Sequence, residues 1–158
     1  MANGLVVSDT TPLINLVGIG LLDLLPQVYG SVSVPQAVAD EFATKAASSD
    51  PDLTHLPWLT IVDGITVDCA LPKLGLGEAA GISLAKAQEA QLVLIDERKA
   101  RRVALSQGLQ VAGTLAVLVR AKNQGLIQAI KPYIQTMETQ GRRFSEVLID
   151  QVLKGIGE

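Results

Sequence analysis

Short apolar runs alternate along the chain with stretches in which apolar side chains recur every three or four residues. The short runs are rich in β-branched residues and stop at turns or at charged residues, which is typical of buried strands. Strands are predicted at residues 6–7, 31–34, 90–95 and 108–112, with shorter extended segments at 58–62 and 65–67.

The periodic stretches predict helices between these strands. They lie at residues 12–17, 21–25, 35–42, 97–107, 113–122, 126–137 and 144–153, with a helix of small residues beginning near Glu78 and a loop over residues 45–57. Because strands and helices alternate, we expect an α/β fold with three α/β/α layers around a parallel sheet of about four or five strands. The last two helices are extra C-terminal elements.

Length and composition indicate a single domain over residues 1–158, in which residues 126–158 form a helical C-terminal extension. Apolar residues make up 48% of the chain, and the net charge of -3 argues against nonspecific electrostatic capture of nucleic acid. We expect a cytoplasmic protein, because no stretch is apolar enough to span a membrane, the N-terminus lacks the features of a signal peptide, and Cys69 has no partner cysteine.

Four acidic residues are candidates for chemistry. Asp9 and Asp96 each follow a predicted strand, and the carboxyl ends of parallel strands meet at one edge of a sheet. Glu41 and Glu78 lie on helices that can flank that edge. Three of these acids also have a purely structural interpretation, because Asp9 can cap a helix, Glu41 can face solvent, and Glu78 can offset a helix dipole.

A divalent cation resolves the repulsion among four such acids, since two carboxylates about 4 Å apart repel by about 4 kcal/mol. Carboxylate ligation favours Mg²⁺ or Mn²⁺ over Zn²⁺, and the lone His55 is a poor candidate ligand. Such ions support phosphodiester hydrolysis. The glycines of Gly75-Leu76-Gly77 do not form a dinucleotide-binding motif, because the third glycine is absent and an acid follows.

A family resemblance rests on residues 7–14, 34–41, 74–85 and 94–101, followed by Gly113-Thr114. In order and spacing these segments resemble the PIN-domain family, including VapC-type toxin ribonucleases and PIN-like nucleic-acid-binding proteins. The resemblance implies RNA cleavage by an endoribonuclease, Mg²⁺ or Mn²⁺ as cofactor, a homodimer, and inhibition by a small antitoxin protein. It assigns catalytic and metal-binding roles to Asp9, Glu41, Glu78 and Asp96, although aspartate is usual in the family at the position of Glu78.

Several further residues are candidates for contacts with RNA phosphates, and the basic start of the helix beside Asp96 supplies most of them. These candidates are Thr10, Arg98, Lys99, Arg101 and Thr114. The alternative for the basic group is a solvated helix face, and for Thr114 an ordinary helix cap.

Three functions are compatible with these residues. The first is a metal-dependent ribonuclease, and the second is a catalytically weak PIN-like module that binds nucleic acid or a protein. The third is a phosphotransferase with Asp9 as nucleophile, which is disfavoured because no lysine follows at a convincing strand end to neutralise the phosphate.

Overall fold

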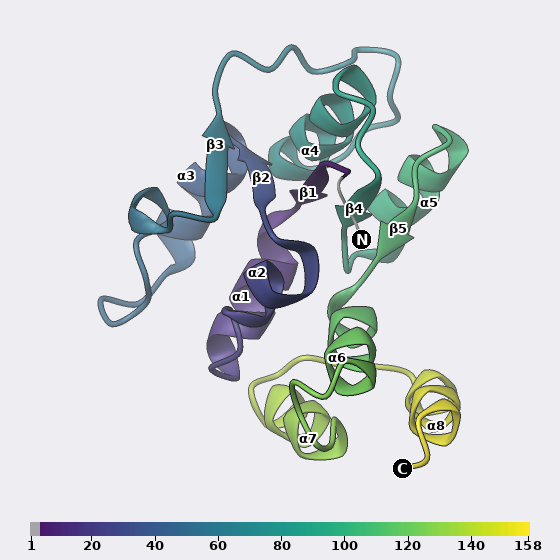
Figure 1. Cartoon of the computed structure of the whole chain (residues 1–158). Coiled ribbons are helices and arrows are strands. Elements are labelled where there is room, and N and C mark those ends of the chain that lie inside the picture. The colour runs from purple at the N-terminus through teal and green to yellow at the C-terminus, as the bar shows by residue number, and fades with distance from the viewer. Residues whose placement is uncertain (1–3) are drawn as a thin grey trace.

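A computed structural model describes residues 4–158 and contains a five-stranded sheet in the order β3-β2-β1-β4-β5 (Figure 1). All neighbouring strands pair in parallel, as predicted. The strands are β1 (Val6–Ser8), β2 (Val32–Pro35), β3 (Leu59–Val62), β4 (Leu92–Leu94) and β5 (Val111–Ala112). From β1 the chain adds β2 and then β3 on one side of the sheet. It then returns to add β4 and β5 on the other side of β1, so the winding reverses between β1 and β4.

Helices connect the strands and extend the chain beyond β5. They are α1 (Thr10–Gly18), α2 (Leu24–Tyr29), α3 (Gln36–Lys45), α4 (Leu76–Ala87), α5 (Arg98–Ser106), α6 (Thr114–Asn123), α7 (Lys131–Thr139) and α8 (Glu146–Gly155), with a short 3-10 turn, η1 (Leu53–His55). Within residues 4–158, no helix combines the length and the apolar character needed to cross a membrane.

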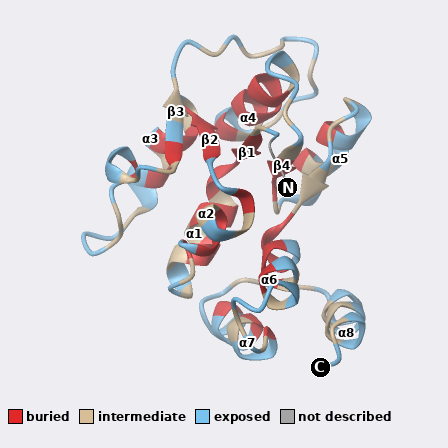
Figure 2. Ribbon diagram, viewed as in Figure 1, coloured by how far each residue is buried: buried red, intermediate tan, exposed pale blue. Residues whose placement is uncertain are grey.

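Two apolar cores lie on opposite faces of the sheet and confirm the three-layer arrangement. Successive side chains of β1 point to opposite faces of the sheet. Val6 packs in the core with α1, α2, α3, α6 and α7, whereas Val7 packs in the core with α4 and α5. Leu94 and Val93 divide between the same two cores on β4. The buried residues therefore concentrate on the strands and the helices next to them, whereas α8 contains none (Figure 2).

Helix boundaries near prolines differ from the prediction. The helix predicted at residues 21–25 is α2, which begins at Leu24 and passes through Pro26 to Tyr29. The helix predicted at 126–137 begins at Lys131, with Pro132 in its first turn. Both prolines lie where a helix leaves its first amides unpaired, so they start a helix rather than end one. The segment 65–67 was predicted to be extended but forms no strand.

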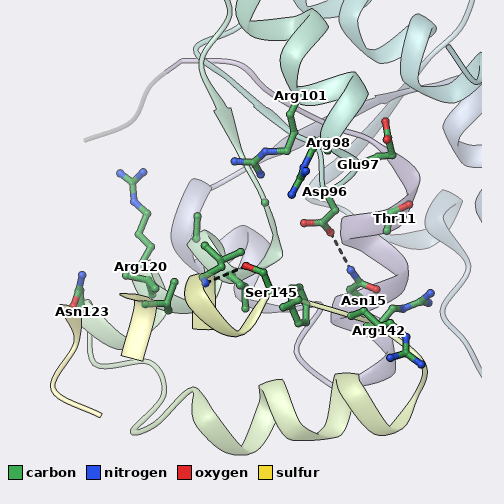
Figure 3. Close-up of a pocket in the computed structure, with 18 residues that line it drawn as sticks. Thr11, Asn15, Asp96, Glu97, Arg98, Arg101, Arg120, Asn123, Arg142 and Ser145 are labelled. Atoms are coloured by element: carbon green, nitrogen blue, oxygen red, sulfur yellow. Dashed lines mark hydrogen bonds between the residues drawn. The ribbon is translucent and has the colours of Figure 1, made fainter. Parts of the chain in front are cut away.

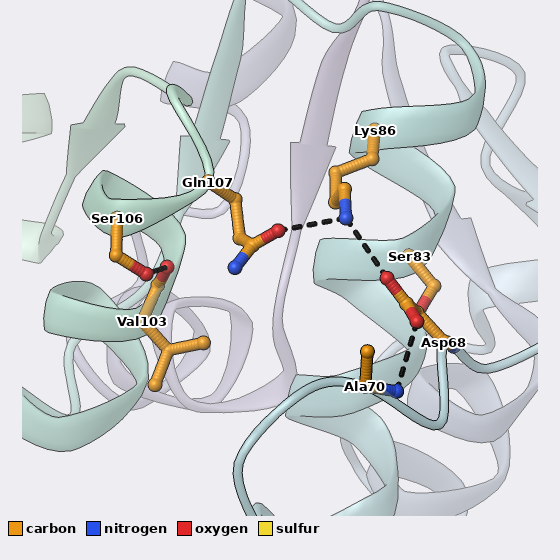
Figure 4. A network of polar contacts seen from close by, with 7 residues as sticks. All are labelled: Asp68, Ala70, Ser83, Lys86, Val103, Ser106 and Gln107. Carbon is orange, nitrogen blue, oxygen red and sulfur yellow. Dashed lines mark hydrogen bonds and ion pairs between the residues drawn. The ribbon is translucent and has the colours of Figure 1, made fainter.

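A polar network attaches the long connection between β3 and α4 to the helical layer (Figure 4). Lys86 of α4 donates hydrogen bonds to Asp68, at 2.9 Å, and to Gln107 beyond α5, at 2.7 Å. The backbone amide of Asp68 donates in turn to Ser83 at 3.0 Å. The network joins α4, α5 and the connection on the face of the sheet that lacks α1.

The C-terminal helix is held at its far end by Glu158. This carboxylate accepts hydrogen bonds from Lys122 Nζ of α6 at 2.9 Å and from the backbone amides of Ile130, at 2.8 Å, and Lys131, at 3.1 Å. Lys122 Nζ also donates to the carbonyl of Ile156 at 3.1 Å. Glu158 thus caps the start of α7 and fastens α8 to α6, although α8 itself packs only through half-buried side chains.

We predict that Glu158→Gln loosens α8. Desolvation opposes ionisation of Glu158, but the hydrogen bonds from Lys122, Ile130 and Lys131 lower its pKa. Its contribution is therefore present above the unfolded-state pKa and is lost as the pH falls through the lower folded-state value. Hydrogen exchange should show reduced protection of the α8 amides. The free energy of unfolding should fall by about 1–2 kcal/mol. Glu138→Gln, an exposed substitution on α7, is the matched control, and equal effects of the two would contradict the prediction.

Candidate active site

Asp9 and Asp96 flank the point at which the winding of the sheet reverses. Asp9 follows β1 directly, and its backbone amide donates to the carbonyl of Leu94, the last residue of β4, at 2.9 Å. Asp96 lies two residues beyond Leu94. In open α/β sheets the loops diverge at this point and leave a crevice for ligands. The two strand-end aspartates predicted from the sequence therefore lie on neighbouring strands at one edge.

The Asp9 side chain is buried without a full set of hydrogen bonds. Only 3% of the residue is exposed, and Oδ1 has no partner among the described residues. Asp9 precedes α1, yet its side chain makes no capping bond to that helix. The helix-cap interpretation of Asp9 is therefore not supported, and the unpaired oxygen is available to a ligand.

Burial raises the pKa of Asp9 from 3.8 to about 7. The backbone amide of Thr10 opposes this shift, while the negative charges of Glu78, Glu41 and Asp96 add to it. The other three predicted acids therefore all lie close enough to act electrostatically on Asp9. A concentration of negative potential around a buried carboxylate favours a bound cation.

Three oxygens surround a single point beside the first turn of α4. A Cβ atom at Gly77 would lie 3.4 Å from Glu41 Oε1 and 3.5 Å from both Asp9 Oδ1 and Thr10 Oγ1. Thr10 Oγ1 also lacks a hydrogen-bond partner, and Thr10 is fully buried. We call this group of oxygens the Gly77 cradle. Any larger residue at position 77 would fill it, and its carboxylate and hydroxyl donors suit a hard cation.

Asp96 is fixed by hydrogen bonds from two helices. Asn15 Nδ2 of α1 donates to it at 2.9 Å, and the backbone amide of Thr114 donates at 2.7 Å. The Thr114 hydroxyl makes a third, short hydrogen bond. A Cβ at Gly113 would approach Asp96 Oδ1 to 2.7 Å, so glycine allows α6 to begin against the carboxylate. Asp96 therefore has one orientation, imposed by α1 and α6.

Glu78 and Glu41 each have a partner outside the group of oxygens around Asp9. Glu78 Oε1 accepts from the backbone amide of Gly75 at 3.1 Å, which ties the side chain to the start of its own helix. Burial raises the pKa of Glu78, and the charges of Glu97 and Glu41 raise it further, against the Gly75 amide. Glu41 contributes one oxygen to the Gly77 cradle, while its other lies 3.7 Å from Lys45.

The donors fit a hydrated divalent ion held by few protein ligands. Within residues 4–158, no three Asp, Glu, His or Cys side chains come together closely enough to hold one ion by themselves. Mg²⁺ commonly uses one or two carboxylates and retains several waters. The unpaired Asp9 and Thr10 oxygens beside Glu41 meet that requirement, whereas ligation by all four acids stays a prediction.

A groove of about 920 Å³ leads away from Asp96 and Asn15 (Figure 3). It runs between α5, α6 and the start of α8, and we call it the α6–α8 groove. Five arginines line it, namely Arg98, Arg101, Arg120, Arg142 and Arg143.

The predicted phosphate contacts are distributed unevenly around this groove. Arg98 and Arg101 line it, and Arg101 Nη1 donates to the Ile95 carbonyl at 3.0 Å. Lys99 is exposed but is not among the lining residues. Thr10 and Thr114 are fully buried, the first in the Gly77 cradle and the second against Asp96.

Sequence reasoning overlooked Asn15, Arg142 and Arg143. Asn15 is a polar residue within the apolar stretch of α1, and a buried polar side chain needs partners, so its position was a usable signal. Arg142 and Arg143 join two helices about 45 residues beyond Asp96, and nothing local in the sequence relates them to the site.

A family model described as a PIN domain matches residues 5–158. The matched range includes Asp9, Asp96, the groove arginines and the C-terminal helices. No curated protein matches the chain.

We predict that Asp9→Asn stabilises the protein in buffer without divalent cations. Because the folded-state pKa of Asp9 is raised, the wild-type protein should lose stability as the pH rises from about 4 to about 7. The neutral amide of the asparagine side chain removes this pH dependence. Above about pH 7 the free energy of unfolding of the variant should exceed that of wild type by up to about 4 kcal/mol. Thermal unfolding across pH measures the effect, with the exposed Asp23→Asn as control. A variant less stable than wild type at every pH would contradict this prediction.

Proposed function

The chain belongs to the PIN-domain family, and from that premise we propose that it is a metal-dependent endoribonuclease that hydrolyses phosphodiester bonds in RNA. The family itself indicates a nuclease-like fold. The observation that carries the proposal is the buried, unpaired Asp9 oxygen beside Glu41 and Thr10, one strand away from the fixed carboxylate of Asp96. Burial of an acid without a partner is costly unless a ligand completes it.

Mg²⁺ or Mn²⁺ is the proposed cofactor. Its proposed ligands in the Gly77 cradle are Asp9, Glu41 and the Thr10 hydroxyl. Asp96 is a further proposed ligand, and Glu78 adds negative charge nearby. When bound, such an ion lowers the pKa of a coordinated water and offsets negative charge on the phosphate.

The protein's own groups position the substrate. Asn15 and Thr114 hold the Asp96 carboxylate in one orientation through hydrogen bonds to both of its oxygens. The Asp9 carboxyl, with its pKa near 7, changes protonation state close to neutral pH when no cation is present. Arg98 and Arg101 provide positive charge beside Asp96, which favours a phosphodiester backbone at that edge.

The biological setting of the proposed enzyme follows from its resemblance to VapC-type ribonucleases. We propose a toxin-like role in the cytoplasm, a homodimer, and inhibition by a small antitoxin protein. We also propose that residues 1–158 act as one domain, in which the extension formed by residues 126–158 contributes to the groove beside Asp96.

A catalytically weak module that binds RNA or a protein is the second candidate. It is favoured by the hydrogen bond that holds Glu78 on Gly75 and by the absence of a three-acid group within residues 4–158. Cleavage measurements separate the two candidates, because a weak module retains binding without turnover.

We predict that the purified protein cleaves a circular single-stranded RNA when Mg²⁺ or Mn²⁺ is supplied, because an endonuclease needs no free end. Asp9→Asn and Asp96→Asn should each lower the cleavage rate by about 100-fold or more, since each removes a charged candidate ligand. Asp23→Asn makes the same charge change at an exposed position and should cut like wild type. Equal cleavage by Asp9→Asn and wild type would reject the proposal.

We predict that Glu78→Gln separates the structural role of this residue from its electrostatic role. The amide oxygen of glutamine can still accept from Gly75, so the melting temperature should change little. The missing charge should weaken Mn²⁺ binding by about 3-fold to 10-fold, which titration calorimetry measures. Unchanged Mn²⁺ affinity would leave Glu78 with a helix-capping role alone.

A further inference from the structure

The α6–α8 groove combines an apolar floor with a basic rim. Its floor is formed by Leu115, Val119, Phe144, Leu148 and Val152, from α6, α8 and the segment before α8. Leu148 remains 42% exposed, although α8 is amphipathic and its neighbours pack against the core. Apolar surface left open inside a groove marks a binding site more often than an isolated apolar residue does.

The arginines of the rim come from three separate parts of the chain. Arg98 and Arg101 belong to α5, Arg120 to α6, and Arg142 and Arg143 to the segment between α7 and α8. Figure 3 shows Asp96 between Arg98 on one side and Arg142 on the other, with Asn15 next to Asp96. The candidate metal ligand therefore lines a groove that also carries positive charge from α5 and from the segment before α8.

Among the described residues, these arginines form no ion pairs, although the acids Asp96 and Glu97 line the same groove. Among residues 4–158, the ion pairs of the chain involve lysine or histidine, and none involves an arginine of the groove. Arg101 donates to a backbone carbonyl, and Arg120 lies over the ring of Tyr29, 5.5 Å from its centroid. The guanidinium groups keep their charge for a ligand, in a chain whose net charge is -3.

We propose that the α6–α8 groove holds the single-stranded RNA substrate, and that Arg142 and Arg143 bind its phosphates on one side of Asp96. This inference rests on the proposed function and assigns a substrate-binding role to the C-terminal segment. Arginine pairs bind phosphate through several directed hydrogen bonds. The apolar floor and Phe144 suit unpaired bases, which a duplex would keep hidden in its stack.

An acidic amphipathic protein helix is the competing occupant, because it too would match an apolar floor and a basic rim. The position of the groove favours RNA. Asp96 is one of its lining residues, so a phosphodiester bound at that carboxylate has its neighbouring nucleotides in the groove. An acidic protein helix would instead place its own negative charges beside the Asp96 carboxylate.

The experiment measures binding of a fluorescently labelled single-stranded RNA by anisotropy, with a chelator present to prevent cleavage. The test variant is Arg142→Gln/Arg143→Gln, and the control is Arg102→Gln/Lys154→Gln, which removes the same charge outside the groove. A third variant, Arg142→Lys/Arg143→Lys, keeps the charge. Thermal unfolding checks that all of them fold.

The groove variant should bind RNA about 10-fold or more weakly at low salt, and the magnitude of its salt-dependence slope should fall by about 1.4 for two lost phosphate contacts. The control should retain the wild-type affinity, and the lysine variant should retain the wild-type slope. A duplex of the same sequence should bind more weakly than the single strand.

Equal affinity of the groove variant and the control would overturn the assignment. The assignment would also be overturned if an acidic amphipathic peptide lost binding in the groove variant while RNA did not. Metal-dependent cleavage by wild type alongside either result would leave the proposed ribonuclease function intact. If wild type neither binds nor cleaves RNA, both proposals fail.

Discussion

The candidate site depends most on the burial of a carboxylate where the parallel sheet reverses its winding. Asp9 follows β1 directly and is 3% exposed. This burial raises its pKa to about 7. An acid in that position gains nothing for folding, because it makes no capping bond and leaves one oxygen unpaired. This cost to folding is what the proposed cation would offset, because a ligand that favours negative charge would pair with the free oxygen.

Two glycines let the neighbouring helices begin close to the two aspartates. Gly77 lets α4 begin close to Asp9 without filling the space between three oxygens. Gly113 performs a similar function for α6, whose first amide then reaches Asp96. The two aspartates differ as a result, since Asp96 is fully hydrogen-bonded and oriented while Asp9 is incompletely bonded. Such a pair combines a fixed carboxylate with one that is free to accept a cation.

Local sequence signals predicted much of the fold because strands, caps and glycines act over a few residues. The parallel sheet and three-layer arrangement followed from the alternation of elements, and the strand-end positions of Asp9 and Asp96 followed from the apolar runs before them. The predicted helix at residues 21–25 missed the boundaries of α2, which begins at Leu24 and continues through Pro26 to Tyr29. The partnership of Asn15 with Asp96 joins residues 81 apart and needed the tertiary structure.

The C-terminal extension illustrates why net charge is a poor guide to what this molecule binds. The chain carries a net negative charge, yet Arg142 and Arg143 join arginines from α5 and α6 around one groove. That juxtaposition requires α8 to stay near α6, and Glu158 supplies the attachment by accepting bonds from Lys122 and from the start of α7. Acidic residues thus have two different roles: one group forms the proposed cation site, while Glu158 attaches the helix that follows Arg142 and Arg143. Because an approaching anion responds to the local electrostatic field rather than to the net charge, this separation lets an acidic protein present a groove lined by arginines next to Asp96.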